Sequence, residues 1–295
     1  MSCVRQAWLV LGSRIVQLED PTQGYFCDTL DLGWPEVREV TNNRPDQDGT
    51  DDRTAYFGSR AVSATIHAVA SAGGPMSIDG AASLFAPFMS PAVRPVLHYI
   101  LDRPGAAERV MTLRAAGYAW PISGADEREI QLQWVAPDPI AYDARGQSAT
   151  AWAGSVGGGR VYNLGFNRIY PAGGSGGSSA IVVSNGDLPV RPIVTLYGPI
   201  SGPVIAWNQS NPTLAGQLRF QPSYVLNAGQ YIIIDTRART VRLAGTTSVL
   251  NQVDWYNSTW PLIQPAPASS TWTLSGTNTS GSTQILIAWS DAYLT

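Results

Sequence analysis

The segment Tyr197–Leu243 constrains the fold of this chain more than any other part of the sequence. Two Gly-Pro pairs and a polar turn divide it into short runs rich in β-branched and aromatic residues. The runs Gln230–Asp235 and Thr240–Leu243 flank a four-residue polar turn, which predicts a β-hairpin. The spacing of apolar residues that marks an amphipathic helix is almost absent. The segment therefore predicts short antiparallel strands.

The rest of the second half follows the same pattern. Short apolar runs recur at regular spacing, with Gly, Pro, Asn and Ser between them. This spacing is typical of a β-sandwich of the jelly-roll or galectin-like type. We therefore expect a C-terminal β-sandwich domain over residues 147–295.

The first half is expected to be a small β-sandwich or barrel-like domain with one helix. Arg60–Val69 alternates apolar and polar residues, which marks a half-buried strand. Ser77–Met89 has an apolar stripe and a possible capping serine, so it predicts a helix whose length Pro87 limits. Pro137-Asp138-Pro139 and the polar residues after it place the domain boundary near Gln147. The predicted domains are residues 1–146 and 147–295, and the whole chain is mainly β.

Composition argues against several classes of protein. Charged residues are only 14% of the chain, the net charge is −3, and all 19 basic residues are arginines without a basic block. These values argue against a nucleic-acid-binding groove. No stretch reaches the length of a membrane span, so we expect a soluble chain made in a cytoplasm, without membrane insertion. Cys3 and Cys27 alone cannot form a disulfide framework or a zinc site, and we expect no cofactor.

Two stretches carry a resemblance to a known family. One runs from Asp48-Gly49 to Tyr56-Phe57-Gly58-Ser59-Arg60 and leads into an alternating strand; another is the Gly-Pro and hairpin segment 197–243. In this order they resemble the distal tail proteins of long-tailed bacteriophages. The Pro-containing runs 89–97 and 134–139 are similar to members from phages of high-GC Gram-positive bacteria.

The resemblance implies a structural virion protein and not an enzyme. Its N-terminal domain would form a ring, usually of six copies, at the distal end of the phage tail. The C-terminal galectin-like domain would project outward. The implied partners are further copies of the chain, the tail tube protein, the tail-tip hub and receptor-binding or adhesin proteins. Assembly would take place in the host cytoplasm.

The loop before the first long strand is the expected contact region between subunits or with the tube. Its acidic residues resemble a Ca²⁺ loop but fail the EF-hand spacing, so we expect no metal site there, although Ca²⁺ binding stays open. Two arginines are expected to donate ion pairs across an interface. The residues predicted for subunit contacts are Asp48, Asp51, Asp52, Tyr56, Phe57, Arg60 and Arg94.

Two alternatives to a purely structural role remain. Trp255, Tyr256 and Trp260 lie in an aromatic-rich C-terminal stretch and could stack on sugar rings, so the C-terminal sandwich could recognise host cell-wall glycan. The second alternative is an enzyme, such as a glycosidase that acts on the cell envelope, and such an enzyme needs paired carboxylates.

The supply of catalytic residues for such an enzyme is small. Residues 147–295 contain four aspartates and no glutamate. Gly173–Gly177 matches the pattern of a nucleophile elbow but is not followed by a helix. His67 and His98 occupy isolated strand positions, where a structural role is expected.

Overall fold

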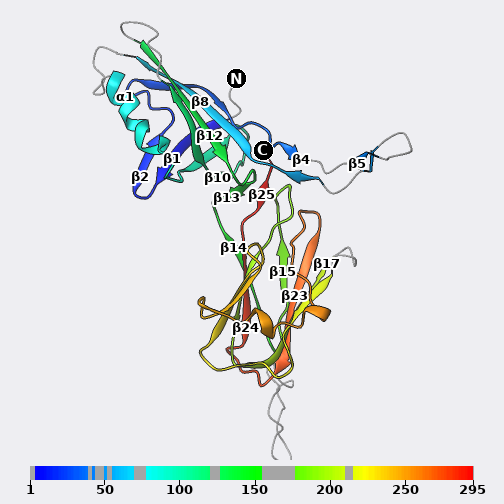
Figure 1. Cartoon of the computed structure of the whole chain (residues 1–295). Coiled ribbons are helices and arrows are strands. Elements are labelled where there is room, and N and C mark those ends of the chain that lie inside the picture. The colour runs from blue at the N-terminus through cyan, green and yellow to red at the C-terminus, as the bar shows by residue number, and fades with distance from the viewer. Residues whose placement is uncertain are drawn as a thin grey trace, which may run out of the picture. The chain divides into compact units, whose positions relative to one another are not determined.

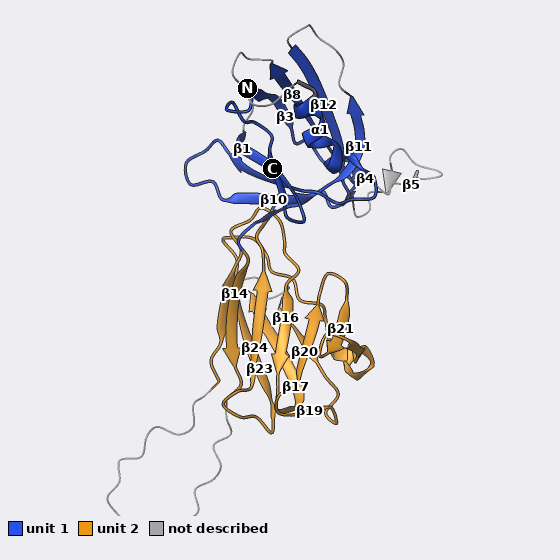
Figure 2. Ribbon diagram, turned by 90° about the vertical axis from the view of Figure 1, so that its left-hand side faces the viewer, with its two compact units in different colours: residues 1–145, 293–295 blue, residues 146–292 orange. Residues whose placement is uncertain are grey.

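The computed structural model describes residues 4–38, 42–43, 50–51, 55–69, 78–119, 127–154, 177–209 and 215–294. The described residues are mostly β-strand in antiparallel sheets, with one short α-helix (Figure 1), which confirms the expected mainly-β class. By their contacts the residues divide into two compact units (Figure 2). Unit 1 contains Met1–Arg145 together with Tyr293–Thr295, and unit 2 contains Gly146–Ala292. The predicted domains, 1–146 and 147–295, were drawn in chain order and therefore placed Tyr293–Thr295 in the second domain, whereas these residues group with unit 1.

Unit 1 is built from two antiparallel sheets, which we name the β1 sheet and the β8 sheet. The β1 sheet has the order β2-β1-β9-β10-β13-β25 and the β8 sheet has the order β11-β12-β8-β3. The β1 sheet contains β1 (Val4–Leu11), β2 (Arg14–Gln17), β9 (Val96–Leu101), β10 (Glu108–Thr112), β13 (Ala141–Asp143) and β25 (Ala292–Tyr293). The β8 sheet contains β3 (Tyr25–Asp31), β8 (Arg60–Val69), β11 (Arg114–Ala119) and β12 (Glu127–Ala136).

The predicted strand Arg60–Val69 is confirmed as β8. Its side chains alternate between the core and the outer face: Val62, Ala64 and Ile66 are buried, while Ser63 is exposed. The neighbouring strand β12 buries every second residue in the same way, because a sheet with one solvated face has a side-chain period of two.

The predicted helix is shorter than its sequence pattern and ends where Pro87 was expected to limit it. α1 covers Ile78–Phe85, and a 3₁₀ turn, η1, continues over Ala86–Met89. Proline lacks the N–H that an α-helix needs and clashes with the preceding turn, so the chain tightens there. Phe85 and Phe88 are fully buried, and the ring of Phe85 meets Tyr25 edge-on at 5.8 Å. The helix thus covers the core of unit 1.

Unit 2 also contains two antiparallel sheets, the β16 sheet and the β17 sheet. Their orders are β14-β24-β16-β20-β21-β22 and β15-β23-β17-β18, with β19 paired to β17. The β16 sheet contains β14 (Gln147–Trp152), β16 (Ile193–Tyr197), β20 (Tyr231–Asp235), β21 (Thr240–Leu243), β22 (Thr247–Ser248) and β24 (Gln284–Trp289). The β17 sheet contains β15 (Ala180–Val183), β17 (Ile200–Gln209), β18 (Gly216–Arg219), β19 (Val225–Leu226) and β23 (Ser269–Thr277).

The predicted hairpin is confirmed as β20 and β21, which pair from Asp235↔Thr240 onward. Asp235 Oδ1 accepts the backbone N–H groups of Arg237 and Ala238 at 2.9 and 2.8 Å, which stabilises the turn. Arg239 closes it with a φ of 54°. That unit 2 has the connectivity of a galectin stays a prediction. In the described ranges no helix is long and apolar enough to cross a membrane.

Candidate assembly and binding surfaces

Within unit 1, the chain between β3 and β8 forms a short two-stranded ribbon. It pairs β4 (Val37–Arg38) with β7 (Tyr56–Phe57) in antiparallel register. Trp34 and Tyr56 are 60% and 59% exposed, and Val37 and Phe57, which stand opposite each other in the ribbon, are also exposed. We name these four residues the ribbon patch. Large exposed apolar side chains are typical of surfaces that bind another molecule, and the predicted contact residues Tyr56 and Phe57 lie where a partner can reach them.

The base of the ribbon is fastened to the start of β8. Gly33 has a φ of 62°, and a Cβ atom there would lie 2.1 Å from the Ala61 carbonyl oxygen. Only glycine permits this close approach. The Gly58 N–H donates to the Glu36 carbonyl at 2.6 Å. The ribbon patch is therefore presented on a defined backbone, and its Trp34 was missed by sequence reasoning although Gly-Trp-Pro in a polar loop is an unusual signal.

The acidic part of the predicted contact loop is described only in fragments. Asp48 and Asp52 lie outside the described residues. Asp51 belongs to β6 (Thr50–Asp51), which pairs with β5 (Asn42–Asn43), and its side chain also lies outside the description. The described residues contain no group of three or more potential metal ligands. The acidic contact surface stays a prediction.

The two predicted interface arginines occupy different environments. Arg94 is exposed, and its Nη1 donates to the carbonyls of Pro91 and Val93 at 2.8 Å each, so it remains accessible to a partner. Arg60 is only 1% exposed, because its guanidinium turns inward and donates to backbone carbonyls of unit 1. A buried guanidinium with these partners serves its own fold, and the expectation of an intersubunit ion pair at Arg60 is corrected accordingly.

The predicted sugar-stacking residues lie together on a turn of unit 2. The 3₁₀ turn η4 (Trp255–Asn257) leaves Tyr256 96% exposed. The rings of Trp255 and Trp260 lie 5.0 Å apart at 37°. We name these three residues the aromatic platform.

Backbone and side-chain bonds hold the platform against the edge strand β18. The Asp254 N–H donates to the Arg219 carbonyl at 2.8 Å, and the Thr259 N–H donates to the Gln217 carbonyl at 2.9 Å. Trp255 Nε1 donates to the Leu250 carbonyl at 3.2 Å. These bonds order the turn before any ligand arrives, so binding would cost little conformational entropy.

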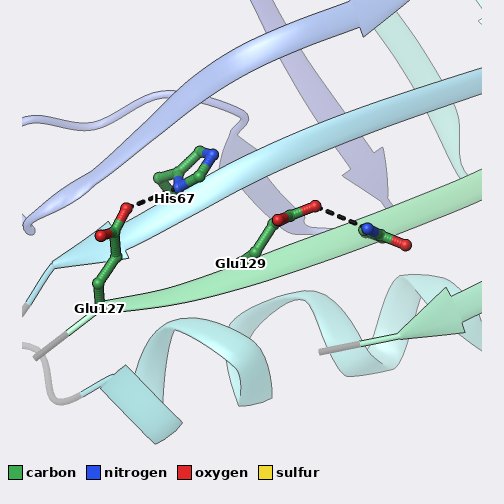
Figure 3. A network of polar contacts seen from close by, with 4 residues as sticks. His67, Glu127 and Glu129 are labelled. Carbon is green, nitrogen blue, oxygen red and sulfur yellow. Dashed lines mark hydrogen bonds and ion pairs between the residues drawn. The ribbon is translucent and has the colours of Figure 1, made fainter. Parts of the chain in front are cut away.

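Both histidines take part in cross-strand pairs on the sheets of unit 1. His67 Nδ1 lies 2.9 Å from Glu127 Oε1 on the partly solvated face of β8 and β12, where Glu129 also accepts a 2.6 Å bond from Gln131 Nε2 (Figure 3). His98 Nδ1 lies 2.6 Å from Glu108 Oε1, and its ring stacks on Trp8. Each histidine thus joins neighbouring strands, as expected for structural positions.

Most carboxylates of unit 2 are engaged in local structure. Asp235 orders the hairpin turn, and Asp254 Oδ2 accepts from Asn257 Nδ2 at 2.8 Å. Asp291 is buried and accepts from Gln147 Nε2 at 2.7 Å. These three aspartates therefore have structural roles, in turn formation and in packing. The pattern Gly173–Gly177 lies outside the described residues except for its last glycine.

A groove of about 610 Å³ lies in unit 1, lined by β1, by the chain after β2 and by β3. Cys27 faces this groove, and burial, together with the charges of Glu19 and Asp28, raises the pKa of its thiol to about 11. A thiol with this pKa stays protonated near neutral pH and is a poor nucleophile. Cys27 therefore does not give this groove an activated thiol.

A scan against protein-family models finds no match, and no curated protein sequence matches the chain either. Some of the solved structures that match are phage proteins. One of them is the Dit protein of phage SPP1, described as a paradigm of the hub adsorption apparatus in phages that infect Gram-positive bacteria. The match covers 97% of this chain and 98% of that chain, with a TM-score of 0.62 and 10% identity. The two proteins thus share a fold over their whole length.

Chains from the activated phage P2 baseplate, solved with Ca and with Sr, also match. They are 12% identical, cover 97% of this chain and 98% of theirs, and have TM-scores of 0.45 and 0.44. A TM-score below 0.5 is too low to support an argument, so the fold comparison depends on the SPP1 Dit protein.

Proposed function

We propose that the protein is a structural component of the distal tail of a long-tailed phage. In this role copies of the chain, six by family resemblance, form a ring. The ring joins the tail tube to the tail-tip hub and supports the adhesion proteins that contact the host. One observation carries the proposal: the fold is shared with the SPP1 Dit protein over 97% of this chain and 98% of that chain, so both units have a counterpart.

The surface of unit 1 supports a role in assembly. A closed ring uses heterologous contacts, in which one surface of each copy meets a different surface of the next copy. The ribbon patch supplies exposed aromatic side chains, which are enriched at the centres of protein interfaces. The β8 sheet also ends at β3, whose outer edge is not paired within that sheet. Such an edge can pair with a neighbouring chain.

The proposed role is tested by measuring the mass of the assembly that the purified full chain forms in solution. Mass photometry and negative-stain imaging of the wild type should show closed rings near six times the 31.6 kDa chain mass. The double variant Tyr56→Ser/Phe57→Ser should fold normally but lose the rings, because two aromatic side chains leave the contact surface. Tyr256→Ser, an exposed aromatic change in unit 2, is the matched control and should leave the rings intact.

A strictly monomeric wild type at high concentration, alone and with tail tubes added, would count against a ring. Rings that persist in the double variant would instead remove the ribbon patch from the interface while leaving the ring itself in place.

A second function is favoured by the aromatic platform. We propose that unit 2 also binds host cell-wall glycan, with sugar rings stacking on Tyr256 and the Trp255–Trp260 pair. The supporting observation is that Tyr256 is 96% exposed on a hydrogen-bonded turn, which is unusual for an aromatic side chain without a partner molecule. This surface is compatible with a structural role of unit 1.

Glycan arrays and cell-wall pull-down with the full chain test this second function. Tyr256→Ala and Trp255→Ala should each weaken retention about tenfold, the size expected from loss of one stacked aromatic ring. Trp152→Ala removes an aromatic side chain of similar exposure from β14 and should leave retention unchanged. Equal retention by all variants would show that the platform binds no glycan.

A further inference from the structure

The last strand of the chain joins a sheet of the first unit, and its second residue, Tyr293, belongs to that unit. β25 (Ala292–Tyr293) lies next to β13 at the edge of the β1 sheet (Figure 1), although almost all of unit 2 separates the two strands in sequence. Both residues of β25 are buried. A two-residue strand gains little from backbone pairing alone, so side chains must hold it in place.

Arg109 on β10 contacts the aromatic ring of this strand. The side chain is 2% exposed, and its guanidinium carbon lies 3.8 Å from the centroid of the Tyr293 ring. Arg109 stands opposite Tyr99 in the register of β9 and β10, and both side chains are buried. Away from water, an arginine over an aromatic face is a strong and specific contact.

Arg60 reaches the same segment from the other sheet. Its Nη1 donates to the Leu294 carbonyl at 2.9 Å and to the Pro139 carbonyl at 3.3 Å, and its Nε donates to the Leu32 carbonyl at 2.5 Å. A buried guanidinium is costly unless its donors are satisfied. The hydrogen bond to the Leu294 carbonyl therefore offsets part of the free-energy cost of burying Arg60.

We propose that Arg60, Arg109 and the edge of β13 form an acceptor site for an extended peptide segment, and that Tyr293 and Leu294 of the same chain are its ligand. The site selects an aromatic ring for Arg109 and a backbone carbonyl one residue later for Arg60. Filling it completes unit 1. This assignment does not depend on the proposed phage role.

Hydrogen exchange of the full chain, read peptide by peptide, tests the site. Tyr293→Ala should increase exchange in β10 and β13 about tenfold or more, because a buried aromatic contact is lost. Exchange in β16 and β20 of unit 2 should stay unchanged. Tyr293→Phe keeps the ring beneath Arg109 and should change exchange less than about threefold. Tyr256→Ala, the matched change of an exposed tyrosine, should affect neither unit.

Three outcomes would overturn the proposal: no change in β10 and β13 in Tyr293→Ala, an equal increase in both units, or the same increase in the Phe and Ala variants. Should Tyr293→Ala give no soluble protein, Tyr293→Leu replaces it, because leucine keeps apolar volume but not the ring. The same three outcomes then apply to Tyr293→Leu.

Discussion

Units 1 and 2 are both built from two antiparallel sheets, but they bury different chemistry. Among the described residues, the buried polar side chains of unit 1 are the cations Arg60 and Arg109. Those of unit 2 are neutral side chains and Asp291, around a core in which Trp207 and Trp272 lie 5.4 Å apart. A core that holds guanidinium groups depends on particular carbonyls and rings, whereas an apolar core depends mainly on volume. Unit 1 should therefore be more sensitive to single changes in donors and to pH.

The titratable groups show the same contrast. In unit 1, burial raises the pKa values of Tyr25 to about 12 and of Cys27 to about 11, with further increases from neighbouring carboxylates. Burial also lowers the pKa of Arg60. In unit 2, burial raises the pKa of Tyr224. The predictions below test this difference, from the largest expected effect to the smallest.

Arg60→Ala should destabilise unit 1 by roughly 3–5 kcal/mol, because the buried Pro139 carbonyl and the part-buried Leu32 and Leu294 carbonyls lose a charged donor at once. Calorimetry of the full chain should show the transition of unit 1 moving to lower temperature while that of unit 2 stays in place. Arg94→Ala, an exposed arginine with only local carbonyl partners, should change neither transition. If Arg60→Ala and Arg94→Ala gave equal shifts, the buried cation would not distinguish the two units.

Cys27 should react slowly with a thiol reagent. Its thiol pKa is raised from 9.0 to about 11, so at pH 8 the thiolate fraction is about a hundredfold lower in the folded chain than in the unfolded chain. Iodoacetamide labelling followed by peptide mapping, with and without denaturant, measures this ratio for Cys27 separately from Cys3. A ratio close to one would mean that the groove in unit 1 does not shield the thiol.

Alkaline pH should weaken unit 1 before unit 2. Because the folded-state pKa values of Tyr25 and Cys27 are raised, their stabilising effect is complete below about pH 9 and is lost as pH rises toward about 12. The calorimetric transition of unit 1 should fall by a few degrees between pH 8 and pH 10.5. The transition assigned to unit 2 should fall less. A parallel decline of both transitions would contradict the contrast between the cores.

Thr236→Val should have the smallest effect and should act on unit 2. The buried Thr236 hydroxyl donates to the Pro192 carbonyl at 2.7 Å, and valine keeps the volume while losing the donor. We expect a loss of about 1 kcal/mol, measured as a shift of the unit 2 transition alone. Thr271→Val on the exposed face of β23 is the matched control and should be neutral.

Local patterns predicted much of the fold. The alternation in Arg60–Val69 and the polar turn before Thr240 each depend on neighbours in sequence, and both elements formed as predicted. Pro87 limited the helix because its effect is also local. The exposure of Tyr56 and Phe57 fits their prediction as contact residues, although their role in assembly is untested.

The burial of Arg60 could not be predicted in the same way. An arginine at the start of a strand is usually exposed, and its inward position here depends on carbonyls at Pro139 and Leu294, far away in the chain. The same limit applies to Tyr293, because a short segment after a complete sandwich pattern carries no local signal of which sheet it joins. Such long-range pairing becomes visible only when both partners are placed in space.

The return of the chain to unit 1 also has a consequence for synthesis on the ribosome. Domains usually fold in the order in which they are made, at about 5–20 residues per second. Here the strands Val4–Leu11 to Ala141–Asp143 emerge first, but the strand that completes their sheet follows residues 146–291. The first unit must then wait roughly 7–30 s for its last strand. During this delay Arg109 lacks the Tyr293 ring and Arg60 lacks the Leu294 carbonyl, so the unit synthesised first is the last to be finished.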